Sequence, residues 1–75
     1  MKFTERFAEL MQEQDEEQKE IAEKLHITPA NISNWKTGRN VPSIETLYEI
    51  CKLMNVSADW LLGLSDYKDI MEKDW

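Results

Sequence analysis

Side chains that could carry covalent or acid–base chemistry are scarce in this chain. It has one histidine, His26, and one cysteine, Cys51. A lone cysteine cannot form an intrachain disulfide, and one histidine with one cysteine cannot assemble a zinc site of the usual Cys/His type. The many carboxylates, as in Asp15-Glu16-Glu17, are expected to be mostly solvated faces that lack a paired basic or metal-ligating partner. We therefore expect no enzyme activity, no metal site and no cofactor.

The distribution of charge indicates binding instead of catalysis. The chain has 15 acids against nine lysines and arginines, yet residues 26–42 (HITPANISNWKTGRNVP) contain no acid. Residues 1–25 and 43–75 each carry a net charge of −4, whereas Lys36 and Arg39 give residues 26–42 a net charge of +2. A chain with a net charge of −6 is not expected to bind a polyanion with its whole surface, but one acid-free face can do so. Residues 26–42 are the predicted binding face.

Length and composition indicate one small domain in the cytoplasm. A chain of 75 residues can bury one core. The N-terminal sequence MKFTERFAEL has charges inside its apolar pattern, and no stretch holds 18 uninterrupted apolar residues. We therefore expect neither a signal peptide nor a membrane span. The lone cysteine agrees with a reducing compartment.

Apolar spacing predicts an all-α fold of five short helices. They are expected over roughly residues 3–14, 15–25, 28–38, 42–54 and a stretch that begins at Val56-Ser57. The connections between them are short, and no alternating apolar pattern typical of a strand occurs.

Capping residues set the expected helix ends. Asp15 with Gln18 three residues later has the form of a capping box for the second helix. Thr28 is an N-cap residue, and Pro29 follows it at a position where a missing N–H costs nothing. Gly38 is placed to end the third helix as a C-terminal glycine.

The expected core includes one tryptophan and leaves two others open. Ile32 and Trp35, three residues apart, are predicted to anchor the third helix, and the fourth helix has one apolar face made of Leu47, Ile50, Cys51 and Met54. Trp60 and Trp75 could be either core edge or dimer contact. Residues 67–75 could be a tail or the start of a further helix.

The stretch QKEIAEKLHITPANISNWKTG, residues 18–38, resembles the helix-turn-helix domain of the Cro and phage-repressor type. The positions that carry the likeness are Gln18, Ala22, Ile27, Ile32, Trp35 and Gly38. With the two helices downstream, the likeness covers about residues 3–66. It implies a five-helix, lambda-repressor-like DNA-binding domain over residues 1–66. In such domains the third helix enters the major groove, usually as a homodimer on a pseudo-palindromic operator.

Four positions depart from the pattern that this resemblance implies. His26 replaces the usual glycine of the turn, and histidine tolerates a positive φ at some cost. Glu17 replaces a small N-cap residue and would repel a phosphate that similar domains contact. Met11 and Lys36 replace an arginine and a glutamate, so both partners of that pair are absent together and no charge is left buried alone.

Two sets of residues are assigned to double-stranded DNA. The predicted base-reading set has the helical spacing i, i+3, i+4 and i+7 and is small or uncharged: Ala30, Ser33, Asn34 and Thr37. The predicted phosphate-contacting set is Gln18, Thr28, Asn31, Lys36, Arg39 and Asn40. Asn34 is expected to contribute most to the discrimination between base pairs, because its amide matches adenine N6 and N7.

The sequence therefore predicts a sequence-specific transcription regulator, a repressor of phage or mobile-element type that occupies its operator without chemistry. The alternative is a protein-interaction module in which the acidic faces bind a toxin or an anti-repressor. DNA binding would weaken with salt and depend on Arg39 and Asn34. Partner binding would survive those changes and fail when the acidic helices are neutralised.

Overall fold

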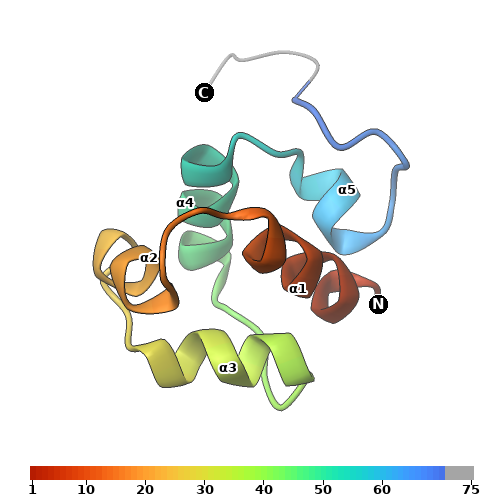
Figure 1. The fold of residues 1–75 in the computed structure, drawn as a ribbon. Coiled ribbons are helices and arrows are strands. Elements are labelled where there is room, and N and C mark those ends of the chain that lie inside the picture. The colour runs from red at the N-terminus through yellow and green to blue at the C-terminus, as the bar shows by residue number, and fades with distance from the viewer. Residues whose placement is uncertain (71–75) are drawn as a thin grey trace.

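The computed structural model describes residues 1–70, and these form five α-helices in a compact arrangement (Figure 1). The helices are α1 (Phe3–Glu13), α2 (Gln18–Lys24), α3 (Pro29–Thr37), α4 (Ile44–Met54) and α5 (Ala58–Leu62). Within residues 1–70 the only β-type pairing is an isolated bridge between Val56 and Asp69. The predicted all-α fold is confirmed.

The prediction that Asp15 caps the second helix is wrong. The N-cap of α2 is Glu17, and its side chain makes no capping hydrogen bond. Asp15 lies in the preceding bend, two residues too early for its carboxylate to accept from the first turn of α2. The family pattern, which places the N-cap beside Gln18, located this helix start correctly.

Both ends of α3 depend on backbone conformations that its sequence favours. The Thr28 hydroxyl accepts from the Asn31 backbone N–H (3.3 Å), and the Asn31 amide oxygen accepts from the Thr28 N–H (3.2 Å), which is a reciprocal capping box. Gly38 ends the helix in the left-handed region with φ 81°. His26, in the turn before α3, has φ 58°, so the turn that favours glycine in similar domains is kept here by histidine.

The core lies where the five helices converge. All five contribute fully buried side chains: Phe3, Phe7, Leu10, Ile21, Ile32, Ile50, Cys51 and Leu61. Phe7 stacks on Phe3, with ring centroids 5.3 Å apart, and meets the edge of Trp35 at 5.7 Å. The predicted inward face of α3 is therefore confirmed, and α3 packs mainly against α1 and α2.

Residues 65–70, which we call the strap, run without helix back over α5. The Ser57 N–H donates to the Lys68 carbonyl (2.8 Å), and Lys68 pairs with Glu13 of α1 (2.5 Å). A further helix in the tail is therefore not formed over residues 67–70. Trp75 lies outside the described residues.

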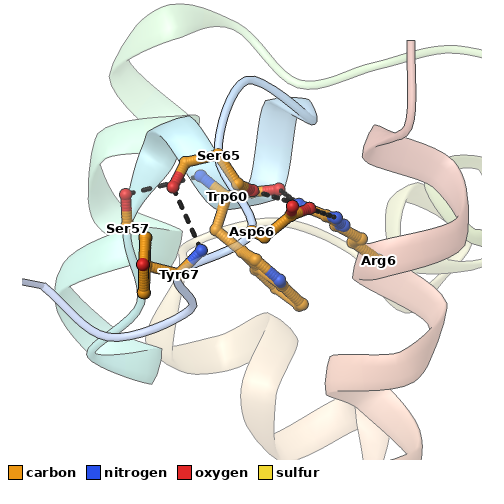
Figure 2. A network of polar contacts seen from close by, with 6 residues as sticks. All are labelled: Arg6, Ser57, Trp60, Ser65, Asp66 and Tyr67. Carbon is orange, nitrogen blue, oxygen red and sulfur yellow. Dashed lines mark hydrogen bonds and ion pairs between the residues drawn. The ribbon is translucent and has the colours of Figure 1, made fainter.

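Arg6 of α1 fastens the strap to α5 (Figure 2). Its guanidinium donates to the carbonyls of Trp60 and Ser65 (2.7 Å for Ser65) and lies 3.5 Å from the Asp66 carboxylate. The same guanidinium lies 4.9 Å from the centre of the Trp60 ring, and Lys68 lies 5.3 Å from it. The sequence left two roles open for Trp60, core edge or dimer contact. Trp60 is 7% exposed and therefore lies at the edge of the core.

Replacing Arg6 with leucine should lower the free energy of unfolding by about 2 to 3 kcal/mol, because two part-buried carbonyls lose a charged donor. Urea unfolding followed by circular dichroism measures this. Arg39→Leu is the matched control, since Arg39 is exposed and its side chain makes no hydrogen bond within the described chain. Equal losses in the two variants would show that Arg6 does not fasten the strap.

Candidate nucleic-acid interface

The helix α3 lies along one edge of the molecule and turns one side outward (Figure 1). Its nine residues give it a length of about 13 Å, a size that the major groove of B-DNA accepts. Ile32 and Trp35 are 0% and 4% exposed, while Ala30, Ser33 and Thr37 are exposed and Asn34 is half-buried. The structure thus brings the four predicted base-reading residues onto the outward side.

Among these four, Asn34 keeps the most hydrogen-bonding capacity. The Thr37 hydroxyl donates to the carbonyls of Ser33 (3.1 Å) and Asn34 (3.2 Å), so its proton is used within the helix. The Asn34 side-chain amide makes no hydrogen bond to any described residue. It can therefore offer a donor and an acceptor together to an outside partner.

Thr28 and Asn31, both predicted phosphate contacts, are tied to each other. The Thr28 hydroxyl donates to the Asn31 amide oxygen (2.8 Å) and accepts from the Asn31 backbone N–H. Because these bonds use the Thr28 hydroxyl proton and the Asn31 amide oxygen, the Asn31 NH₂ group is the side-chain donor of this pair that remains for an outside partner. The pair is positioned at the N-terminus of α3, where the helix dipole favours an anion.

Gln18 and Lys36 meet across the gap between α2 and α3. The Lys36 ammonium donates to the Gln18 amide oxygen at 2.5 Å, and both side chains are half-buried. The lysine thus fixes which end of the Gln18 amide faces inward. The NH₂ end of Gln18 is left to donate outward from the first turn of α2.

Arg39 and Asn40 follow the left-handed Gly38 and are exposed. Neither side chain hydrogen-bonds to residues 1–70. Together with Lys36 they flank the outward side of α3, and Lys36 and Arg39 give residues 26–42 their positive charge. A surface of this kind can receive phosphates on its flank and uncharged base edges at its centre.

Glu17 is an exposed acid next to Gln18, at the start of α2. It caps α2 without a side-chain hydrogen bond. Glu17 directly precedes Gln18, whose NH₂ group makes no hydrogen bond to residues 1–70. Glu17 therefore opposes anion binding at this end of the surface.

The lone cysteine lies in the core and is not part of this surface. Cys51 is buried in the core, and burial raises the pKa of its thiol, which makes the thiolate harder to form. Over residues 1–70, no three His, Cys, Asp or Glu side chains gather where they could hold a metal ion. None of the five helices is both long enough and apolar enough to cross a membrane.

Sequence reasoning missed two contacts that position this surface. The capping box of Thr28 has asparagine where glutamate or glutamine is usual, so the familiar pattern did not reveal it. The bond between Gln18 and Lys36 joins residues on different helices, and no local pattern indicates it. Pairing a glutamine that opens α2 with a lysine on the last turn of α3 requires knowledge of how the two helices cross.

Comparison with known proteins gives one family and two curated relatives. A family model described as Helix-turn-helix matches residues 7–61, more than half of the chain. The HTH-type transcriptional regulator ImmR of Bacillus subtilis (strain 168) is 38% identical over 74 residues, which is 99% of this chain and 58% of that protein. The HTH-type transcriptional activator BcrR of Enterococcus faecalis is 34% identical over 63 residues, 84% of this chain and 31% of that protein. The chain thus spans less than two thirds of either relative. No solved structure matches it significantly.

Proposed function

This chain belongs to the helix-turn-helix family, and we propose that it is a sequence-specific DNA-binding transcription regulator with α3 in the major groove. The observation that carries this proposal is the outward side of α3. In a chain of net charge −6, this side has no acid, presents uncharged readers and is flanked by Lys36 and Arg39. Both curated relatives carry names that describe transcriptional regulators.

We assign the contacts to DNA from the hydrogen-bonding groups that each side chain leaves unused within the domain. Asn34 reads an adenine, while Ala30 contacts a thymine methyl and Ser33 and Thr37 make less selective contacts. The phosphate set is divided between the two ends of α3. Thr28 and Asn31 serve the N-terminal end, through an amide and the helix dipole. Gln18, which is bonded to Lys36, serves the other end together with Lys36, Arg39 and Asn40.

The regulator acts by occupying its operator and needs no chemistry to do so. We propose a repressor of phage or mobile-element type that binds a pseudo-palindromic site as a homodimer in the cytoplasm. Two-fold symmetry would place the second α3 in the major groove one helical turn away, so the half-sites should be about 34 to 36 Å apart.

Salt tests the electrostatic part of this proposal. Affinity for DNA should fall steeply with ionic strength, with log K decreasing against log[salt] by about 0.9 for each phosphate neutralised. Arg39→Ala should reduce that slope by about one per bound subunit. Fluorescence anisotropy with an operator selected from randomised DNA measures the slope.

Lys52→Ala is the matched control, because Lys52 is exposed near the end of α4 and outside the proposed surface. Its slope should equal that of the parent chain. An affinity that does not change between low and physiological salt would refute the interpretation of the acid-free window. The protein-interaction alternative would then gain support.

Replacing Glu17 with serine should strengthen DNA binding for all sequences alike. A serine hydroxyl can cap α2, and a repulsive charge is removed beside Gln18, which together are worth about 1 kcal/mol. Parallel titrations with an operator and with unrelated DNA check that both improve. Glu9→Ser, an exposed acid of α1, should leave both affinities unchanged. Weaker binding by Glu17→Ser would give Glu17 a positive role instead.

A further inference from the structure

A groove beside the helix-turn-helix is not used by the proposed DNA contacts. Leu25 and Ile27 of the turn before α3 form one wall, and Ile44 and Tyr48 of α4 form the other. Its volume is about 650 Å³, which is within the range of ligand-binding pockets. Ile44 is 85% exposed and Tyr48 is 43% exposed. The groove therefore offers apolar side chains to the outside.

The apolar wall on α4 extends the core-packing face of this helix beyond the part that the core covers. Ile50 and Cys51 are buried, and Leu47 packs partly against the same core. Ile44 and Tyr48 are four residues apart and lie on the same helical stripe as Leu47 and Cys51, but nearer the N-terminus of α4, where the core does not cover them. Packing within the domain does not explain an isoleucine that is 85% exposed at the first position of α4. Clustered exposed apolar side chains are typical of binding surfaces.

The rim of the groove is acidic. Glu45 and Glu49, also four residues apart, line it and are exposed. Neither carboxylate forms an ion pair with any residue between 1 and 70. Two unpaired carboxylates on the rim attract positive charge at the edge of whatever the apolar walls receive.

This charge selects among possible occupants. Phosphates of DNA would be repelled by Glu45 and Glu49. A second copy of the chain seated symmetrically would bring two such rims together, in a chain whose net charge is already −6, and like charges across an interface cost affinity. A segment with apolar side chains flanked by lysine or arginine satisfies both the walls and the rim.

We propose that this groove is a docking surface for a cationic, amphipathic segment of another protein. Such a segment would place aliphatic or aromatic side chains between the turn and α4 and its basic groups against Glu45 and Glu49. The groove adjoins the turn that leads into α3 but does not include Asn34 or Arg39. The docked segment therefore does not cover the proposed base reader or this basic residue, and the proposal does not depend on the DNA assignment.

A random-peptide display library tests the proposal. The library is selected on the full chain and depleted on an Ile44→Ser/Glu45→Lys/Glu49→Lys variant. We expect the enriched peptides to combine apolar residues with lysine or arginine. The most enriched peptide, labelled with fluorescein, is then titrated against purified variants whose circular dichroism matches that of the parent.

Glu45→Lys/Glu49→Lys should weaken binding of this peptide by about tenfold or more, because two attractions become repulsions. Glu5→Lys/Glu9→Lys is the matched control, since these are also exposed glutamates four residues apart, on α1. It should change binding by no more than about twofold. Amide chemical shifts should move mainly in the turn residues 25–27 and the first half of α4.

Three results would overturn the proposal. The first is the absence of any peptide that depends on the groove, and the second is equal weakening by the two charge-reversal pairs. The third is self-association of the parent chain in sedimentation equilibrium that Ile44→Ser abolishes, which would assign the groove to a second copy. DNA affinity measured on the same variants reports the proposed function separately.

Discussion

Trp35→Ala should lower the free energy of unfolding by about 3 to 5 kcal/mol, the cost of removing a large aromatic from a packed core. Trp35 is 4% exposed and meets the edge of the Phe7 ring with an interplanar angle of 72°. The free energy of unfolding of a small domain is only about 5 to 15 kcal/mol, so much of the variant should be unfolded. Urea unfolding at 25 °C, with circular dichroism as the signal, measures the loss.

Tyr67→Ala is the matched control for this truncation. Tyr67 is also aromatic, but it is 72% exposed on the strap. Its removal should change stability by no more than about 0.5 kcal/mol. A Trp35→Ala variant that stays as stable as the parent and loses only DNA affinity would show that Trp35 contacts the ligand. The assignment of the inward and outward sides of α3 would then be wrong.

Asn34→Ala should lose about 1 to 3 kcal/mol of discrimination at one A·T pair in each half-site, with little change in affinity for non-specific DNA. The physical reason is that Asn34, among the four predicted base-reading residues, presents an unused donor and acceptor in one plane. A binding-site selection carried out in parallel on the parent and the variant measures preference at every operator position.

Arg39→Ala supplies the contrasting control for Asn34→Ala. It should weaken binding to all sequences about equally, because a phosphate contact carries no base information. An Asn34→Ala variant with an undiminished preference at every position would place base reading elsewhere. Thr28 and Asn31, at the N-terminus of α3, are then the next residues to vary, together with the N-terminal residues of the chain.

The helices and their buried sides were predictable from the sequence because they depend on local spacing. Apolar residues repeat with the helical period, and the stripe that contains Phe3, Phe7 and Leu10 is buried as expected. The same argument placed Ile32 and Trp35 inward, and this fixed the outward side of α3. The one wrong helix start, at Asp15 instead of Glu17, arose because Asp15 and Gln18 have the spacing of a capping box, whereas Glu17 begins α2 without any side-chain capping bond.

The residue types on the candidate surface were also predictable, but the hydrogen bonds that their side chains make within the domain were not. The absence of acid from residues 26–42 is visible in the sequence. That Thr37 uses its proton on the backbone, while Asn34 keeps both hydrogen-bonding groups, follows only from atomic positions. Capping by asparagine at Asn31 was overlooked because that residue is an uncommon partner in a capping box.

By itself, then, the sequence determined the five helices, the inward and outward sides of α3 and the location of the acid-free window, since each depends on residues within a few positions of one another. Tertiary structure alone decided which distant side chains meet. Lys36 bonds to Gln18 across 18 positions, and Arg6 bonds to Ser65 across 59. The groove between the turn and α4 likewise exists only once the helices have packed. Helix crossing sets these contacts, and crossing geometry depends on the whole core instead of on any local pattern.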